Sequence, residues 1–206
     1  MAVMLAATSI GSKFVLDADA VRTCVDTLRA GGLVVHPTDT VYGLAADPFQ
    51  EAAVARVYAA KQRPRDLSVS VCVADVSDIF RFGERTPLAE AFCAKNLPGP
   101  YTVVLRARAE APTAVLSKDG RLGFRVPAHP IPRLLAKRVG PITSTSANLH
   151  GKSPTVTCDE ARAQLGDAVD VYVDGGPATL GVESTVVDLT GPRANVLRSG
   201  SVPKES

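Results

Sequence analysis

The chain has 206 residues, of which 46% are hydrophobic and 21% are charged, proportions typical of a folded globular domain rather than a disordered chain. The net charge of +2 gives no bulk electrostatic case for nucleic-acid binding, so any such surface would have to be local. No apolar run approaches the ~20 residues that span a bilayer, and we therefore expect no contact with the membrane.

Helical and strand patterns alternate from the N-terminus onward. Residues 1–10 lack the basic start and long apolar stretch of a secretory signal, and we interpret them as a flexible lead-in. Residues 17–30 carry apolar side chains at helical spacing before two glycines, and 33–35 form a short apolar run. Further helices are predicted at 51–61, 76–82, 87–95, 131–137 and 158–165. Further strands are predicted at 68–74, 101–107, 122–126, 141–145, 169–173, 185–189 and 195–197.

This alternation, with short connections and no internal repeat or linker, predicts a single domain over residues 1–206. Its folded core would cover about 14–203, followed by a short flexible C-terminal tail. The fold class is α/β, built on a twisted, mixed β-sheet that is flanked by helices.

The cysteines and histidines form no metal-binding pattern. The four cysteines are widely spaced without a CxxC pair, and Cys24 and Cys93 lie within apolar helical patterns. This predicts buried, reduced thiols and a cytoplasmic protein rather than disulfides or zinc. His36, His129 and His150 form no HExxH motif, so no histidine-held metal is expected.

Polar residues concentrate at the ends of the predicted strands, where α/β folds place their sites. Residues 37–44 combine hydroxyls, a carboxylate and a phenol, which either bind a small polar ligand or only cap a turn. The basic residues of 61–65 are either a solvated helix end or a clamp for a polyphosphate. Arg125 interrupts an apolar strand and needs an anion, either a substrate carboxylate or an acid of the core.

Four consecutive hydroxyl residues, 143–146, lie at the end of a predicted strand and could cradle phosphates. Segment 146–153 also approaches the P-loop pattern GxxxxGK[ST], but Ser146 replaces the first glycine, which the tight turn requires. There is no GxSxG elbow and no close pair of carboxylates with a histidine. The residues therefore predict binding and positioning of anionic substrates rather than covalent catalysis.

Seven segments, in order, resemble the YrdC/TsaC family over about residues 31–200. They are 37–44, 61–63, 97–100, 125–127, 146–148, 174–176 and 184–188. The family's KxR and SxN patterns are intact as Lys61, Arg63, Ser146 and Asn148. The resemblance implies a YrdC-like fold and a nucleotidyltransferase that makes threonylcarbamoyl-AMP and pyrophosphate from L-threonine, bicarbonate or CO2, and ATP. The product would supply N6-threonylcarbamoyladenosine in tRNA through a separate transferase complex.

The resemblance also implies roles for individual residues. The threonine set is Thr40, Cys72, Arg125, Ser144 and Ser184, with Arg125 on the carboxylate. The ATP set is Lys61, Arg63, Ser146, Asn148, Ser153 and Arg198, with Lys61 and Arg63 as catalytic cations that face the phosphates. Mg2+ would arrive with ATP, held by phosphates and water rather than by a protein metal site. The chain departs from the family at Leu67-Ser68, where many relatives carry Asn-Pro, and at Cys72, where a histidine is common.

Two other functions fit a domain of this kind. The fold's concave surface has been proposed to bind double-stranded RNA or tRNA, and the basic residues of this chain could contact RNA phosphates. A domain of the hydrogenase-maturation type shares the fold but occurs within a much longer chain. The intact SxN and KxR patterns favour the enzyme, because RNA backbone binding requires cations rather than precisely placed hydroxyls.

Overall fold

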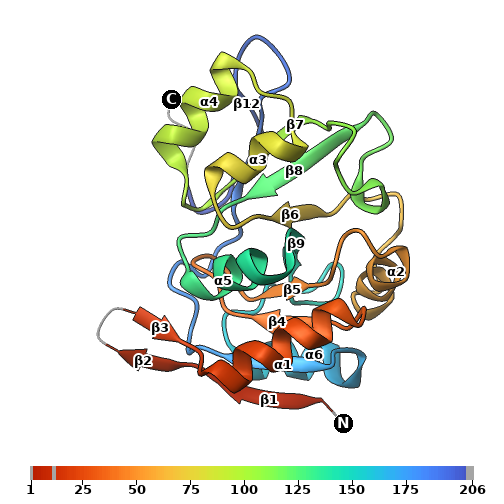
Figure 1. Cartoon of the computed structure of the whole chain (residues 1–206), viewed down its shortest axis with the longest axis vertical. Coiled ribbons are helices and arrows are strands. Elements are labelled where there is room, and N and C mark those ends of the chain that lie inside the picture. The colour runs from red at the N-terminus through yellow and green to blue at the C-terminus, as the bar shows by residue number, and fades with distance from the viewer. Residues whose placement is uncertain (1, 11–12, 203–206) are drawn as a thin grey trace.

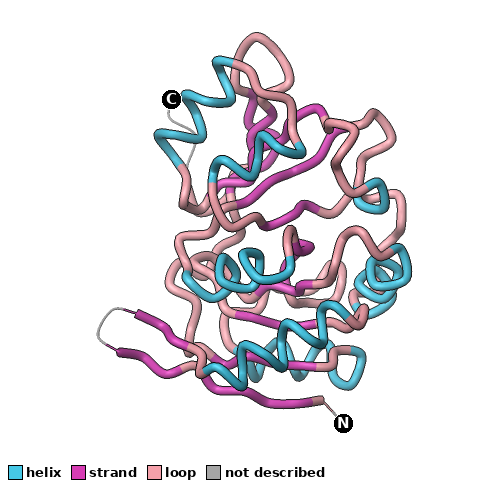
Figure 2. Tube along the Cα trace, in the orientation of Figure 1, coloured by secondary structure: helices cyan, strands magenta, loops and turns pink. Residues whose placement is uncertain are grey.

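A ten-stranded mixed sheet runs through the molecule (Figures 1 and 2). The structure is a computed structural model, and it describes residues 2–10 and 13–202. In spatial order the strands are β1 (Val3–Ala6), β10 (Val171–Asp174), β4 (Val34–His36), β5 (Gly43–Ala45), β9 (Ile142–Ser146), β6 (Ser70–Cys72), β8 (Arg121–Arg125), β7 (Tyr101–Arg106), β11 (Thr185–Asp188) and β12 (Asn195–Arg198). Strand β10 is parallel to β1 and β4, whereas β9 is antiparallel to β5 and β6. The predicted mixed sheet flanked by helices is confirmed.

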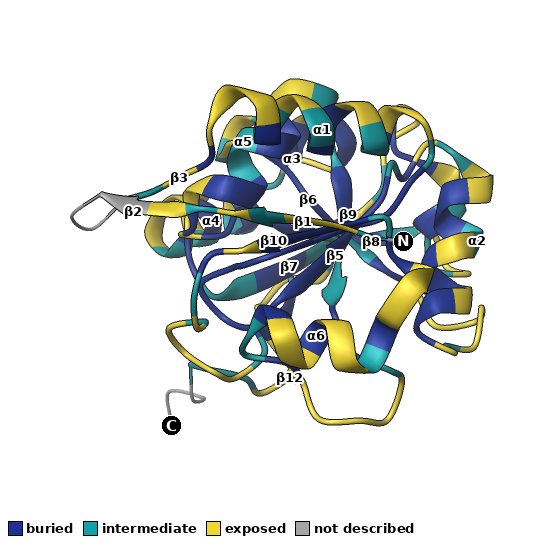
Figure 3. Ribbon diagram, turned by 90° about the horizontal axis from the view of Figure 1, so that it is seen from below, coloured by how far each residue is buried: buried dark blue, intermediate teal, exposed yellow. Residues whose placement is uncertain are grey.

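Both faces of the half-sheet that contains β4 and β10 are covered by helices (Figure 3). These helices are α1 (Ala18–Arg29), α2 (Glu51–Ala60), α5 (Pro130–Val139) and α6 (Cys158–Leu165). Val34 packs with α1 and α5, whereas Val35 packs with α2 and α6, because successive side chains of a strand point to opposite faces. Burial on both faces explains why this strand reads as a continuous apolar run.

The other half of the sheet is packed differently on its two faces. Helices α3 (Val76–Phe82) and α4 (Pro87–Asn96) cover one face, where Val71, Val103 and Phe124 join a large apolar core. The adjacent residues Cys72, Thr102 and Arg125 point to the opposite face and line a pocket. The alternation of apolar and polar residues along β6, β7 and β8 therefore separates the core from the site.

The helices begin and end close to where the sequence patterns predict. The Asp17 side chain accepts a hydrogen bond from the Ala20 N–H (2.7 Å) and caps α1, and Gly31 follows that helix with φ +78°. Thr157 and Glu160 form a capping box at the start of α6. Among the described helices, none is both long and apolar enough to cross a membrane.

The expectation of a flexible N-terminal lead-in is wrong. Strand β1 forms an edge of the main sheet, with Val3 opposite Val171 and Leu5 opposite Val173. The strands β2 (Thr8–Ile10) and β3 (Lys13–Val15) then form a hairpin beside it (Figure 1). The pairing partner of β1 lies at the far end of the sequence, so no local pattern announces this strand. The expected C-terminal tail after residue 203 lies outside the described residues.

The predicted burial of the cysteines is confirmed and leads to a simple test. Cys24, Cys72, Cys93 and Cys158 are all buried and unpaired. Burial raises the pKa of Cys93 to about 11 and the pKa of each of the other three to about 12. Because thiolates are the reactive form, we expect a disulfide reagent to label no cysteine rapidly in the native protein at pH 8 and all four after unfolding. A rapidly labelled native thiol would contradict this burial.

Candidate active site

The uncovered face of the second half-sheet holds a polar pocket of about 310 Å3, a volume within the range of small-molecule sites. Its walls come from the ends of β6, β7, β8, β9 and β12 and from the loops after β4 and before β11. Hydroxyl groups and arginines dominate these walls. Such a surface favours an anionic ligand with several hydrogen-bonding groups.

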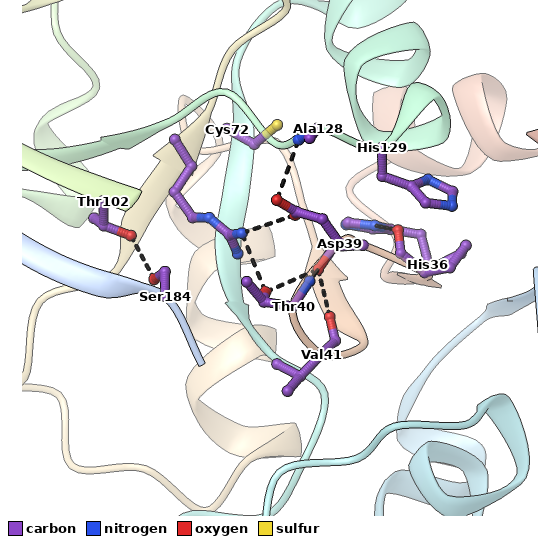
Figure 4. Close-up of polar contacts among 12 residues, drawn as sticks. His36, Asp39, Thr40, Val41, Cys72, Thr102, Ala128, His129 and Ser184 are labelled. Carbon is purple, nitrogen blue, oxygen red and sulfur yellow. Dashed lines mark hydrogen bonds and ion pairs between the residues drawn. The ribbon is translucent and has the colours of Figure 1, made fainter. Parts of the chain in front are cut away.

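Arg125 is the buried cation of this pocket, only 7% exposed at the end of β8. Its Nη2 donates to Asp39 Oδ1 (3.2 Å) and to Thr40 Oγ1 (3.1 Å) (Figure 4). Asp39 also accepts a hydrogen bond from the Ala128 N–H through Oδ2 (3.2 Å). A core acid therefore balances the arginine, as one of the two sequence-based alternatives required. Arg125 Nε has no partner among the described residues, so the guanidinium keeps unused hydrogen-bonding capacity.

The loop after β4 is shaped by its own side chains. Thr38 Oγ1 donates to the Val41 carbonyl (2.6 Å) and accepts from the Thr40 N–H (3.1 Å). Thr38 thus fulfils the turn-capping role, whereas Asp39 holds Arg125 and Thr40 lines the pocket. The turn-capping interpretation therefore holds for Thr38, whereas Asp39 and Thr40 contact Arg125 at the pocket.

A second hydrogen-bonded group lies across the pocket, where β11 and β12 meet. Ser184 Oγ lies 2.8 Å from Thr102 Oγ1 (Figure 4), and Arg198 Nη2 donates to the Ser184 carbonyl (2.9 Å). Arg198 Nη1 also forms an ion pair with Glu183 (2.9 Å). These contacts fix a hydroxyl and a cation side by side at the pocket wall.

The turn that follows α2 contributes one cation to the pocket and buries another. Arg63 lines the pocket and donates to the Ser68 carbonyl through Nη2 (3.1 Å). Lys61, which is 2% exposed, instead donates to the carbonyls of Ser146 and Asn148. Of the three basic residues in segment 61–65, Arg65 is exposed and fits the solvated interpretation, whereas Lys61 and Arg63 do not.

The family model Sua5_yciO_yrdC, described as "Telomere recombination", matches residues 26–200. A Mycobacterium tuberculosis protein (strain H37Rv), provisionally named threonylcarbamoyl-AMP synthase, is 40% identical over 188 residues, which are 89% of this chain and 85% of that protein. The chain belongs to the Sua5/YciO/YrdC family. The family resemblance inferred from the motifs is confirmed.

Solved structures of the Sua5/YciO/YrdC family have the same fold. A crystal structure of Pyrococcus abyssi Sua5 complexed with L-threonine superposes with a TM-score of 0.89 at 30% identity, covering 100% of this chain and 59% of that one. The crystal structure of Escherichia coli YciO gives a TM-score of 0.85 at 28% identity, covering 97% of this chain and 95% of that one. The predicted YrdC-like fold is confirmed.

Most of the residues that the family motifs selected meet in the pocket. Those that line it are Thr40, Arg63, Cys72, Arg125, Ser144, Ser146, Ser184 and Arg198. Lys61 and Asn148 are buried behind the lining, and Ser153 is exposed outside it. The expectation that Lys61 faces phosphates is corrected, because its N–H groups point to protein oxygens. Ser153 lies in the exposed turn 151–154, where Gly151 has φ +77°.

The P-loop alternative is wrong for a structural reason. A P-loop leads directly into a helix whose first turn holds the phosphates. Here segment 146–157 is non-helical, and α6 begins only at Cys158. Lys152 is exposed rather than turned toward a nucleotide site.

Thr102 and His36 are among the residues of this Sua5/YciO/YrdC pocket that sequence reasoning missed. Thr102 was hidden in an apolar strand, although its position between Tyr101 and Val103 puts it on the face opposite the core. His36 was considered only as a metal ligand. It lines the pocket at the end of β4, and its ring lies so close to Gly43 that an added Cβ would meet Cε1 at 2.8 Å.

His36 and His129 are both buried near Asp39 and Arg125 (Figure 4). Desolvation, opposed in part by the His36–Pro37 hydrogen bond, lowers the pKa of His36 to about 4. Desolvation likewise lowers the pKa of His129 to about 4, with Asp39 opposing it. Both imidazoles are therefore neutral near pH 7.

These two histidines predict a pH-dependent stability. Between pH 6.5 and about 4 the unfolded chain binds more protons than the folded one, so the free energy of unfolding falls as the pH is lowered. From pH 7.5 to 5 each histidine should account for about 2 kcal/mol. Urea unfolding at pH 7.5 and at pH 5 measures this change in the free energy of unfolding. His129→Asn, which keeps a capping side chain, should remove about half of the loss.

Proposed function

We propose that this protein is an L-threonylcarbamoyladenylate synthase, which converts L-threonine, bicarbonate or CO2, and ATP into threonylcarbamoyl-AMP and pyrophosphate. The observation that carries the proposal is a pocket in which the buried Arg125 converges with Arg63, Arg198 and several hydroxyl groups. Arginine side chains at these positions suit the carboxylate of an amino acid and the phosphates of a nucleotide, which both accept charge-assisted hydrogen bonds. The names of the relatives agree with this activity.

Threonine would occupy the end of the pocket at Arg125. The guanidinium, with its free Nε, would bind the carboxylate, while Thr40 and Ser184 would supply hydroxyl contacts. Ser144 extends this set from β9. Cys72 is a neutral, buried thiol at this end and would contact the apolar part of the amino acid.

ATP would lie beside threonine in the same pocket. Arg63 and Arg198 would face the phosphates, and Ser146 would donate to one of them. Asn148 and Ser153, which do not line the pocket, are left out of this substrate set. The neighbouring Glu183 keeps Arg198 in place through their ion pair.

The reaction needs no covalent enzyme intermediate. The threonine nitrogen forms a bond to the carbon of bicarbonate, and water leaves to give a carbamate. A carbamate oxygen then bonds to the α-phosphorus of ATP, and the bond to the bridging oxygen of the β-phosphate breaks, releasing pyrophosphate. Arginines that are already oriented toward the phosphates stabilise the charge that develops during this transfer.

Mg2+ fits this site only as a companion of the nucleotide. Glu183 is the carboxylate among the described lining residues, and it is already paired with Arg198. No group of three or more metal-binding side chains occurs among the described residues. We therefore propose that the phosphates and water hold Mg2+, which would offset charge on the leaving pyrophosphate.

The proposed partners follow from the product. A mixed anhydride of a carbamate and a phosphate is an activated acyl donor, so a separate transferase must carry the threonylcarbamoyl group to tRNA. The alternative of an RNA-binding module is less well supported. RNA phosphates would require exposed cations, whereas Thr40, Ser184 and Arg125 are buried around a small pocket.

The test is pyrophosphate release from purified protein with ATP, Mg2+, threonine and bicarbonate, omitting one component at a time. We expect release to require both threonine and bicarbonate, and Arg63→Ala or Ser146→Ala to lose most of it. Lys95→Ala changes an exposed residue of α4 and serves as the control. ATP hydrolysis to ADP without threonine, or no reaction, would overturn the proposal.

A further inference from the structure

Lys61 has an unusual environment for a lysine of a nucleotide-binding motif. It is the C-cap residue of α2 and is 2% exposed. Its Nζ donates to the Ser146 carbonyl, to the Asn148 carbonyl (2.7 Å) and to Asn148 Oδ1 (3.4 Å). An ammonium group has three N–H donors and no acceptor. All three donors of Lys61 therefore have protein oxygens as partners, and none remains for a phosphate.

Main-chain hydrogen bonds also join the end of α2 to residues 146–152. The Lys61 carbonyl accepts a hydrogen bond from the His150 N–H (2.7 Å). Asn148 is oriented by its other end, where Nδ2 donates to the carbonyls of Leu149 (3.0 Å) and Lys152 (2.7 Å). Residues 146–152 are thus held to the end of α2 through both the side chain and the backbone of one lysine.

This connection joins two groups that the pocket needs together. Gln62 has φ +50°, so the chain reverses direction between Lys61, which points inward, and Arg63, which lines the pocket. Ser146 also lines the pocket, while its carbonyl accepts from Lys61. The lysine therefore fixes where Arg63 lies relative to the serines of β9.

We propose that Lys61 is a positioning residue that contacts neither ATP nor threonine, and that it sets the alkaline limit of the reaction by holding the end of β9 against the end of α2. The inference rests on the proposed function for its kinetic test. It assigns the lysine of the KxR pattern a different role from the arginine two residues later. Removing Lys61 should therefore weaken the binding of both substrates, because serines of β9 would contact both of them.

The charge state of Lys61 connects this role to pH. Burial, reinforced by the nearby charge of Arg63 and opposed by Glu183, lowers the pKa of Lys61 to about 8. The neutral amine has two N–H donors for three oxygen acceptors, so one contact is lost as the pH rises through 8. Since the unfolded lysine keeps its proton to about pH 10.4, this ionisation does not lower the free energy of unfolding. As the pH rises above 8, activity should therefore fall while the free energy of unfolding does not.

The decisive experiment is an NMR titration of the full chain labelled with 15N-lysine, in which Lys61→Arg assigns the Lys61 Nζ signal. We expect the signal to titrate near pH 8, and saturating ATP with Mg2+ to raise this midpoint by less than about a unit, because the phosphates would act on Lys61 only through the charge of Arg63. A phosphate contact would instead raise the midpoint by a unit or more, because an opposite charge favours the protonated form, and would overturn the proposal. Asn148→Leu, which removes one acceptor, should lower the midpoint whether or not ATP binds. An unchanged midpoint would also overturn the proposal.

The pH dependence of pyrophosphate release provides the kinetic readout. The ratio of wild-type to Lys61→Arg activity should fall about tenfold from pH 7.5 to 9, because the guanidinium keeps its charge. Lys61→Met should raise the KM values for ATP and threonine together, whereas an effect confined to ATP would contradict the proposal. Lys95→Met should leave both values unchanged. An inactive wild type would disprove the proposed function, while the NMR titration would still decide the role of Lys61.

Discussion

Arg125→Met should lower kcat/KM for threonine by ~100-fold or more and the free energy of unfolding by about 3 kcal/mol. Both effects have one origin. The guanidinium balances Asp39 at 3.2 Å, and the two side chains are 9% and 11% exposed. Methionine fills a similar volume but leaves a buried carboxylate without its cation. The threonine carboxylate loses its partner at the same time.

The two effects can be separated by variants that keep part of the pair. Arg125→Lys retains a charge but not the fork that reaches Asp39 and Thr40 together, so it should recover stability more than activity. Arg133→Met breaks an ion pair with Asp75, a residue that is 58% exposed, and should cost less than about 1 kcal/mol. Equal losses in Arg125→Met and Arg133→Met would contradict this account of the buried pair. Urea unfolding and the KM for threonine are the measurements.

Gly200→Ala should cost about 3 kcal/mol of stability and most of the activity, although the residue touches no substrate. A Cβ at this position would lie 2.2 Å from the Glu183 carbonyl oxygen and 2.5 Å from the Ser184 carbonyl carbon. Both are main-chain atoms, which cannot rotate away as a side chain can. The strand ends that hold Ser184 and Arg198 would have to separate.

Gly191→Ala is the matched control, because the nearest atom to its added Cβ is the Arg193 carbonyl oxygen at 4.0 Å. It should change stability by less than about 0.5 kcal/mol. Thermal unfolding and pyrophosphate release, measured on both variants, test the difference. A Gly200→Ala protein as active as the Gly191→Ala protein would show that β11 and β12 need not pack this closely.

The strands were predicted correctly where buried side chains recur at a regular spacing along the sequence. The apolar run 33–35 and the alternating Val69, Val71 and Val73 both became strands, because burial on two faces or on one face leaves a distinct pattern. Strand β1 left no such signal. It is short and lies at an edge, and its pairing with β10 depends on residues that the local pattern does not contain.

The sequence predicted most of the residues that form the site but not how they are arranged. Hydroxyls and cations at strand ends identified most of the pocket lining, since function requires those residue types where a strand stops. Composition could not distinguish Arg63, which lines the pocket, from Lys61, which lies behind it. That difference depends on the reversal of the chain at Gln62. Thr102 was missed because one hydroxyl within an apolar strand resembles a core residue until its facing is known.

The position of β1 has a consequence for synthesis of the chain. Residues 3–6 leave the ribosome long before residues 171–174, with which they pair, and β10 also separates them from β4. One half of the sheet therefore cannot close until most of the chain has been translated, and contacts so distant in sequence form slowly. Until then the nascent protein exposes the unpaired edge of β4 and the apolar β1 segment. We expect this interval, rather than the finished enzyme, to be the stage at which chaperones bind the chain.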